Sequence, residues 1–459
     1  MGRLFGTDGA RGVAVTELTC ETAMQIGRAA ASVLCKKAGH RARILIGKDT
    51  RISSDIMEAA LTAGILSVGA DVISLGVVPT PAVAFLVKAM RADGGVMISA
   101  SHNSMEFNGI KLFSGTGFKL SDDIEEEIEA LVLDTPEKLT QSLKSGSNVG
   151  RLTVDREAVT SYIRHILATG EKSFEGMRIA VDCANGSASA TAEKLFTGLG
   201  AKVYLLSCEP DGTNINDSCG STHLEQLSNF VKANSCDLGI AFDGDADRCL
   251  AVDENGTVVD GDKLIAIFAK DMSERGRLAD NAAVVTVMTN IGFSFFAKEN
   301  GIKMITTKVG DRYILEQMLA GGYSLGGEQS GHIIFRNFAS TGDGQLTAIQ
   351  LLSVMKRSGK KLSELAELME RYPQVMINVK ISPRWKEAWK NIPEIEEIIE
   401  NKEKELDGSG RILVRESGTE PLVRVMVEAP DHDTCQKYVD EVVNVICEKG
   451  YKACEQSYP

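Results

Sequence analysis

The sequence predicts an α/β protein in which parallel or mixed sheets are covered by helices, followed by a smaller α+β domain. Short β-branched runs alternate with longer helical patterns over most of the 459 residues, as expected when strands and helices follow each other in turn. Hydrophobic residues make up 43% of the chain and charged residues 25%, the balance of an ordinary folded α/β protein. After Tyr372 and Pro373 this alternation stops. At about 150 residues per domain, the length corresponds to about three compact units, with two or four as alternatives.

The first α/β region contains four predicted strands and two predicted helices. The strands are expected at 43–47, 71–75, 96–99 and 110–113, and the helices at 54–68 and 81–91. Thr80 is a candidate N-cap for the second helix, with Pro81 in its first turn. The polar stretch 141–150 then interrupts the pattern. We therefore place the first domain boundary at residue 150.

The alternation resumes in two further regions. Strands are expected within 178–186, 202–206, 237–256, 284–290 and 303–311. Two of them end at Asp182 and Asp243, each followed by a glycine-containing turn, where α/β folds present polar groups to ligands. Similar modules therefore recur along the chain, although no fixed-period repeat aligns. The predicted domains are 1–150, 151–253, 254–370 and 371–459.

The last predicted domain has few elements. It begins with a strand at 375–380 and a charged helical stretch at 384–406. Two short strands at 411–417 and 422–428 and a helix at 434–449 follow. This combination predicts a small α+β domain.

Charge and hydropathy exclude several classes of partner. Fifty Lys and Arg residues against 63 Asp and Glu residues give a net charge of −13, which disfavours binding to nucleic acid or anionic lipid. No apolar run reaches the roughly 18 residues of a membrane span. Residues 1–10 also lack the basic and apolar pattern of a signal peptide. We therefore expect a cytoplasmic protein with no membrane contact, as a monomer or a homodimer.

The cysteines and histidines give no metal-binding or redox pattern. Ten cysteines are scattered along the chain without a C-x-x-C pair, and the six histidines lack H-E-x-x-H spacing. Free buried thiols are therefore the expectation.

Three alternating aspartates form the clearest candidate metal site. Asp243, Asp245 and Asp247 lie in FDGDADR, directly after an apolar strand. Alternate residues of an extended segment face the same way, so the three carboxylates can converge on one cation. Oxygen ligands favour Mg²⁺ or Ca²⁺ over Zn²⁺. An EF-hand is excluded because its ligand sequence does not continue, whereas an acidic surface turn remains an alternative.

A second candidate segment is VMISASHNSMEFNGIK, in which a buried strand is followed by Ser101 and His102. A serine beside an imidazole at the end of an α/β strand could be a nucleophile. A polar turn explains the same residues, and the G-x-S-x-G elbow of serine hydrolases is absent.

Three further segments carry groups that could bind an anion or a polyhydroxyl ligand. In RLFGTDGARG, glycines allow backbone amides to face an anion, with Arg11 as a cationic partner. In SLGGEQSGH, Glu328, Ser330 and His332 alternate and would suit a polyhydroxyl ligand. RESGTEPLVR combines hydroxyls, a glycine amide and two arginines, the groups that hold a phosphate. Taken singly, each segment could also be an ordinary turn or loop.

Taken together, the five motifs resemble the α-D-phosphohexomutase family over the whole chain. They occur in the order GTDGARG, ISASHN with NGIK, DGDADR, GGEQSGH and RESGTEPLVR. The resemblance implies three related α/β domains and a smaller C-terminal α+β domain around a central cleft. Within the family, KVGDRY, GGEQSGH, TGDG and SGTEPLVRVMVE are most similar to the bacterial branch that acts on glucosamine phosphates.

The resemblance also implies roles for individual residues. Ser101 carries a phosphoryl group and shares one Mg²⁺ with the three aspartates. Catalytic roles fall to Arg11, His102, Lys111 and Arg248. Substrate contacts fall to Lys308, Glu328, Ser330, His332, Arg415, Ser417, Gly418, Thr419 and Arg424. One departure is Ser104, where the family commonly has proline, and its lack of a fixed φ predicts a looser loop around Ser101.

The implied reaction moves a phosphoryl group between the 6- and 1-positions of a hexosamine, through a bound hexosamine 1,6-bisphosphate that is both intermediate and activator. It would supply precursors for UDP-N-acetylglucosamine and the cell wall. Lys111 is the candidate base, although its pKa, ordinarily about 10.4, would have to fall. His102 is the alternative.

Three alternatives remain at this point. The first is another specificity within the family, for glucose or mannose phosphates. The second is a magnesium-dependent sugar phosphatase with Asp243 or Asp245 as nucleophile. The third is a phosphosugar-binding protein in which Ser101 is never phosphorylated.

Overall fold

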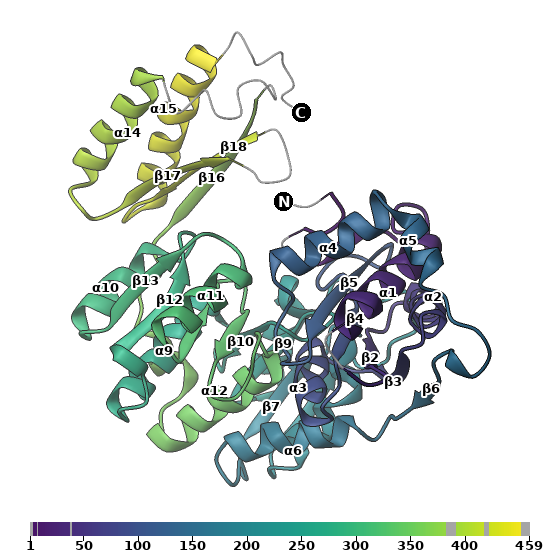
Figure 1. Cartoon of the computed structure of the whole chain (residues 1–459). Helices are drawn as coiled ribbons and strands as arrows, with labels where there is room; N and C mark the ends of the chain where they lie inside the picture. The colour runs from purple at the N-terminus through teal and green to yellow at the C-terminus, as the bar shows by residue number, and fades with distance from the viewer. Residues whose placement is uncertain (1–2, 7, 37–38, 382–391, 417–421, 451–459) are drawn as a thin grey trace. The chain divides into compact units, whose positions relative to one another are not determined.

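The computed structural model describes residues 3–6, 8–36, 39–381, 392–416 and 422–450. These residues form two compact units. The first unit, residues 1–289 and 300–368, contains three sheets, and the second, residues 290–299 and 369–459, contains a fourth (Figure 1). The predicted fold class of three α/β domains with mixed sheets and a C-terminal α+β domain is confirmed.

The first sheet has six strands in the order β1-β5-β4-β2-β3-β6. β2, β3, β4 and β6 run parallel, whereas β5 is antiparallel to both β1 and β4. The strands are β1 (Ala10–Val13), β2 (Arg43–Lys48), β3 (Asp71–Val77), β4 (Gly94–Ile98), β5 (Phe107–Ser114) and β6 (Leu152–Val154). Because β6 pairs with β3, this sheet extends past the boundary predicted at residue 150.

Five helices accompany the first sheet. They are α1 (Cys20–Cys35), α2 (Ser53–Ser67), α3 (Thr80–Ala89), α4 (Asp122–Leu133) and α5 (Pro136–Gln141). Helices α1, α4 and α5 were not anticipated from the sequence. The predicted N-cap at Thr80 is wrong: α3 begins at Thr80 itself, and its cap is Pro79. The Thr80 hydroxyl is instead used at the site described below.

The second sheet has the order β11-β10-β9-β7-β8. Its strands are β7 (Arg178–Asp182), β8 (Lys202–Leu206), β9 (Leu238–Phe242), β10 (Cys249–Asp253) and β11 (Val258–Val259). β9 is buried along its whole length, as expected of a central strand covered on both faces, and its apolar run ends directly at Asp243. The accompanying helices are α6 (Val159–Thr169), α7 (Ala192–Thr197) and α8 (Glu225–Asn234).

The third sheet has the order β13-β12-β14-β15. Its strands are β12 (Ala282–Thr286), β13 (Lys303–Thr307), β14 (Leu325–Gly327) and β15 (Ile333–Phe335). Helices α9 (Gly261–Glu274), α11 (Asp311–Gly321), α12 (Gly344–Ser358) and α13 (Leu362–Ala366) belong to the same unit. Asp260 and Asp343 cap α9 and α12 by accepting hydrogen bonds from the amides of Lys263 and Leu346.

The second unit contains the antiparallel sheet β16-β18-β17. The strands β16 (Gln374–Lys380), β17 (Arg411–Glu416) and β18 (Leu422–Glu428) pack with α14 (Pro393–Leu406) and α15 (His432–Gly450) around one apolar core. α10 (Ile291–Glu299) belongs to this unit as well. The first part of the predicted helical stretch, residues 384–391, lies outside the described residues.

The prediction of buried free thiols holds for part of the described cysteines: Cys183, Cys219, Cys236, Cys249 and Cys435 are buried, whereas Cys20, Cys208 and Cys447 are partly exposed. All eight are free in the described part of the chain. In that same part, no helix combines the length and the apolar character needed to cross a bilayer.

Candidate active site

Ser101 lies in a tight loop after β4 and is almost completely buried, with 1% of its surface exposed. Its backbone is left-handed (φ +55°), a conformation that non-glycine residues adopt only when the surroundings hold them there. The Ser101 amide donates to Ser99 Oγ at 2.9 Å. The Ser101 hydroxyl donates to Asp243 Oδ2 at 2.5 Å. The serine and the first aspartate of the acidic motif are therefore direct neighbours.

The buried guanidinium of Arg51 binds the backbone of the Ser101 loop. It donates to the carbonyls of Ser101 at 3.1 Å and Asn103 at 2.7 Å, and also to that of Ser104. Asp49 pairs with Arg51 Nε at 2.9 Å, and both side chains are fully buried. The loop carbonyls are therefore tied down without the proline that the family commonly has at position 104. These contacts oppose the looser loop expected from Ser104, and the effect of Ser104 on loop rigidity stays a prediction.

We expect Arg51→Met to be strongly destabilising. The substitution would leave Asp49 as a buried carboxylate without its cation and would remove donors from three loop carbonyls. Breaking a buried pair in this way costs about 3–5 kcal/mol of unfolding free energy, measurable by urea denaturation. A suitable control is Arg41→Met, because the pair of Arg41 with Asp71 is partly exposed and such pairs contribute about 1 kcal/mol or less. Equal losses for the two variants would contradict the anchoring role of Arg51.

The acidic motif after β9 brings its three carboxylates together. One oxygen from each of Asp243, Asp245 and Asp247 lies within 4.8 Å of the others, and all three residues are buried. Gly244 lies between the first two, and a Cβ there would be 2.6 Å from the Ser101 carbonyl. Only glycine therefore allows the acidic loop to approach the serine loop so closely.

The surroundings of the three aspartates fit a hard divalent cation. Asp245 Oδ1 and Asp247 Oδ1 are buried without a hydrogen-bond partner in the described residues. Burial, and then the charges of Asp247 and Asp245, raise the pKa of Asp243 well above its ordinary value. Three crowded carboxylates with unused oxygens are the donor set that Mg²⁺ takes, so the predicted metal site is consistent with the geometry.

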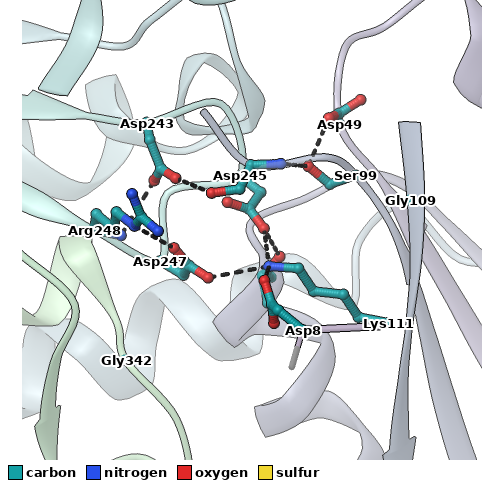
Figure 2. Close-up of polar contacts among 12 residues, drawn as sticks. Asp8, Asp49, Ser99, Gly109, Lys111, Asp243, Asp245, Asp247, Arg248 and Gly342 are labelled. Atoms are coloured by element: carbon teal, nitrogen blue, oxygen red, sulfur yellow. Dashed lines mark hydrogen bonds and ion pairs between the residues drawn. The ribbon is translucent and has the colours of Figure 1, made fainter. Parts of the chain in front are cut away.

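Asp245 is also tied to the first sheet and to Lys111. The Thr80 hydroxyl donates to Asp245 Oδ2 at 2.6 Å. Lys111 Nζ lies 2.8 Å from Asp245 Oδ2, 3.2 Å from Asp247 Oδ2 and 3.1 Å from Asp8 Oδ2 (Figure 2). Burial favours the neutral amine, but these three carboxylates outweigh it and raise the pKa of Lys111 well above its ordinary value. In this arrangement Lys111 is an ammonium group.

His102 and two arginines complete the surroundings of Ser101. His102 Nδ1 lies 3.3 Å from Ser101 Oγ. Burial, and then the charges of Arg248 and Arg11, lower the pKa of His102 to about 4, so its imidazole is neutral at pH 7. Arg248 Nε lies 4.0 Å from Asp247 Oδ1, and Arg11 pairs with Asp8. Nε of both arginines is buried without a hydrogen-bond partner in the described residues.

The predicted sugar loop divides into two parts. Glu328 and Ser330 are half-buried, and Glu328 Oε1 accepts from the Gly310 amide at 3.1 Å. His332 is only 3% exposed, with Nδ1 3.7 Å from Asp247 Oδ2. His332 therefore contacts the acidic motif. Lys308 is exposed, with Nζ 5.9 Å from the centroid of the Tyr313 ring.

The predicted phosphate motif lies in the second unit and is described in part. Arg415 on β17 and Arg424 on β18 are direct cross-strand partners. Nε of each is buried without a hydrogen-bond partner in the described residues. Burial, and then the charge of Arg424, lower the pKa of Arg415. Two neighbouring guanidinium groups with unused donors are suited to an anion. Ser417, Gly418 and Thr419 lie outside the described residues.

Several residues at the site were missed in the sequence. Asp49 and Arg51 follow the end of β2, and polar residues directly after a parallel strand could have drawn attention to them. Asp8 lies in the glycine-rich N-terminal motif but was passed over for Arg11. For Asn216, whose side-chain amide donates to the carbonyls of Ser101 and Asn103 at 2.9 Å, no local pattern gives a signal.

Four family models match successive parts of the chain. They are the phosphoglucomutase/phosphomannomutase α/β/α domains I (2–138), II (160–256) and III (260–372), and the C-terminal domain (376–445). The chain belongs to the phosphoglucomutase/phosphomannomutase family. The predicted resemblance to the phosphohexomutases is thereby confirmed. The exact boundaries predicted at residues 150, 253 and 370 remain predictions.

Individual relatives within this family are similar over their full length. The phosphoglucosamine mutase of Acetivibrio thermocellus is 52% identical over 98% of this chain and 100% of its own. That of Clostridium perfringens is 52% identical over 97% and 99%.

Solved structures support the fold. A phosphoglucomutase/phosphomannomutase family protein from Burkholderia thailandensis matches with a TM-score of 0.81 and 23% identity, over 98% of each chain. Aspergillus fumigatus N-acetylphosphoglucosamine mutase, solved in complex with GlcNAc-6P and magnesium, matches with a TM-score of 0.68 and 18% identity. These two chains overlap over 97% of this chain and 96% of the fungal one.

Proposed function

We propose that the chain interconverts glucosamine 6-phosphate and glucosamine 1-phosphate through a phosphorylated Ser101 and a bound hexosamine 1,6-bisphosphate. The chain is an isomerase of the phosphohexomutase family, and its full-length relatives at 52% identity are phosphoglucosamine mutases. The observation that carries the phosphoserine proposal is the buried Ser101 hydroxyl, 2.5 Å from one of three clustered carboxylates.

The proposed cycle has two transfers. The P–O bond of phosphoserine 101 breaks, and the phosphoryl group bonds to the free 1- or 6-hydroxyl of the sugar monophosphate. The hydroxyl proton passes to a base, and the Ser101 oxygen takes up a proton. The bisphosphate then turns over and returns its other phosphoryl group to Ser101. The left-handed backbone at Ser101, held by the loop contacts, keeps its oxygen in a fixed direction for both transfers.

Charge neutralisation is the main task of the site in such a transfer. We propose one Mg²⁺ per chain, held by Asp243, Asp245, Asp247 and the phosphoserine. When bound, it would neutralise charge on the transferred phosphoryl group. The side chains of Arg11 and Arg248 have unused buried donors and would contact the same group.

The general base that accepts the proton of the sugar hydroxyl is a separate proposal. Lys111 remains the candidate by resemblance, but its three carboxylate partners keep it protonated in the metal-free arrangement. A cation that occupies the aspartates would weaken two of these ion pairs. His102 is neutral and close to Ser101 Oγ, but a pKa of about 4 makes it a weak base at pH 7.

The site would have to bind the sugar phosphate in two orientations, because its 1- and 6-positions react in turn. Lys308, Glu328 and Ser330 are the proposed contacts to the sugar, and the resemblance also assigns His332 to this loop. Because His332 is buried beside Asp247, its contribution would be to hold the loop rather than to reach the substrate freely. Arg415, Ser417, Gly418, Thr419 and Arg424 are proposed to hold the phosphate that does not react.

The decisive experiment is a comparison of kcat/KM for the 6-phosphates of glucosamine, glucose and mannose under one set of Mg²⁺ and bisphosphate conditions. We expect glucosamine 6-phosphate to lead by tenfold or more, about 1.4 kcal/mol of transition-state binding. A lead by glucose or mannose 6-phosphate would replace the proposed substrate but keep the phosphoserine chemistry. Steady release of free phosphate would indicate a phosphatase instead.

A further inference from the structure

Six charged or titratable side chains at the site form a closed ring, and the mechanism above uses only part of it. Each member lies within 3.7 Å of the next. In order, the ring is Asp8, Lys111, Asp247, His332, Asp311 and Lys119, which returns to Asp8. Asp8, Asp311 and Lys119 are the members to which neither sequence nor mechanism assigns a role, and Lys119 is the cation that joins the other two.

Lys119 is placed by the first sheet. It follows the turn after β5, and its backbone forms a bridge with Phe113 on that strand. Its ammonium group donates to Asp8 Oδ1 and to Asp311 Oδ2, and only 14% of its side chain is exposed. Burial favours the neutral amine, but Asp311 and Asp8 outweigh it and raise the pKa of Lys119. Lys119 therefore stays charged and joins two carboxylates that would otherwise repel each other.

Asp311 connects Lys119 to the sugar loop. It is the first residue of α11, and its Oδ2 lies 3.4 Å from His332 Nε2. The preceding residue, Gly310, donates its amide to Glu328 Oε1 at 3.1 Å. The ion pair of Lys119 with Asp311 thus fixes the segment that in turn contacts both Glu328 and His332. Lys119 does this from the sheet that also carries Lys111.

We propose that Lys119 is a positioning residue that sets the sugar loop against the serine and metal loops by bridging Asp8 and Asp311. This inference rests on the proposed function, because it assigns the Glu328 loop to sugar binding. Lys119 contacts neither reacting atom nor metal ligand. Its effect is exerted through Asp311 on Glu328 and His332, and through Asp8 on Lys111.

If Lys119 only stabilised the fold, its substitution would give a different result from that of a positioning residue. Loss of a buried ion pair lowers the thermal stability in either case. Only a positioning role changes the affinity of the folded protein for the sugar phosphate. We therefore expect Lys119→Met to raise both KM and the calorimetric Kd for glucosamine 6-phosphate by tenfold or more, with a smaller change in kcat. Lys119→Arg, which keeps the charge and both partners in reach, should stay within about threefold of the wild type.

Two further variants keep the test independent of folding. Asp311→Asn leaves Lys119 paired with Asp8 and should reproduce the rise in Kd, and its combination with Lys119→Met should add little further. The matched control is Lys36→Met, which causes the same change in net charge but breaks an exposed pair with Glu127 on α4. It should bind and turn over like the wild type.

The wild type is measured by turnover and by calorimetry in the same buffers. Absence of turnover with retained, Lys119-dependent binding would overturn the proposed function and leave the inference standing. Normal turnover with a Kd for Lys119→Met and Asp311→Asn within twofold of the wild type would overturn the inference alone. Fully additive losses in the double variant would also overturn it, because Lys119 would then act independently of Asp311. A wild type that does not bind glucosamine 6-phosphate would overturn both.

Discussion

Ser101→Ala is expected to lose mutase activity by about 10³-fold or more, because the variant has no oxygen that can carry the phosphoryl group between the two half-reactions. The fold should persist. The backbone contacts of the loop come from Arg51, Asn216 and Ser99, and none of them uses the Ser101 hydroxyl. Near-complete loss of activity, with a drop in unfolding free energy of only about 1–3 kcal/mol from the lost hydrogen bond to Asp243, is therefore the specific expectation.

The measurement combines turnover of glucosamine 6-phosphate with intact-mass detection of one covalent phosphate. The wild type incubated with bisphosphate should carry the phosphate and lose it to added substrate, whereas Ser101→Ala should carry none. Ser104→Ala is the matched control, because the loop contact of Ser104 with Arg51 is made through its backbone carbonyl. Retention of more than a few per cent of activity in Ser101→Ala would exclude the covalent mechanism.

Asp243→Asn should lower the activity without lowering the thermal stability of the metal-free protein. Asp243 is buried beside two other carboxylates, so ionisation of its side chain opposes folding when no cation is present. A neutral amide of the same shape removes this repulsion, and the metal-free variant should melt at or above the temperature of the wild type. Its activity should fall by about 10² to 10³-fold, because the proposed cation would lose a charged ligand and the Ser101 hydroxyl would lose its charged acceptor.

Thermal melts with and without Mg²⁺ check this prediction. Because a ligand that binds only the folded state stabilises it, Mg²⁺ should raise the melting temperature of the wild type and have a much smaller effect on Asp243→Asn. Asp280→Asn serves as the control, since Asp280 pairs with Lys303 at the surface, away from the three aspartates. An equal Mg²⁺-dependent rise in wild type and Asp243→Asn would contradict the assignment of Asp243 as a ligand.

Local sequence patterns were sufficient to predict much of the fold and the cluster of three aspartates. The apolar runs that became β4 and β9 are followed at once by the Ser101 and Asp243 loops, and strand alternation makes this readable in sequence. The spacing of Asp243, Asp245 and Asp247 likewise predicted that three carboxylates converge, which the structure contains, although they meet in a turn with Ala246 left-handed (φ +55°) and not along an extended segment. Helix α4 was missed, although Asp122, Asp123 and Glu125 in its first turn form a helix-start pattern.

The sequence alone therefore determined the α/β class, the order of the motifs and the residue types that carry charge, because each depends on neighbours a few positions apart. Tertiary structure decided which charges meet. Arg51 reaches the carbonyls of the serine loop, and Lys119 reaches Asp311, through contacts between residues 50 or more positions apart. The surroundings then decided how those charges behave: burial leaves His102 neutral, whereas the carboxylates around Lys111 outweigh burial and keep it protonated. Long-range contacts and desolvation have no local signature, so only the folded chain could reveal them.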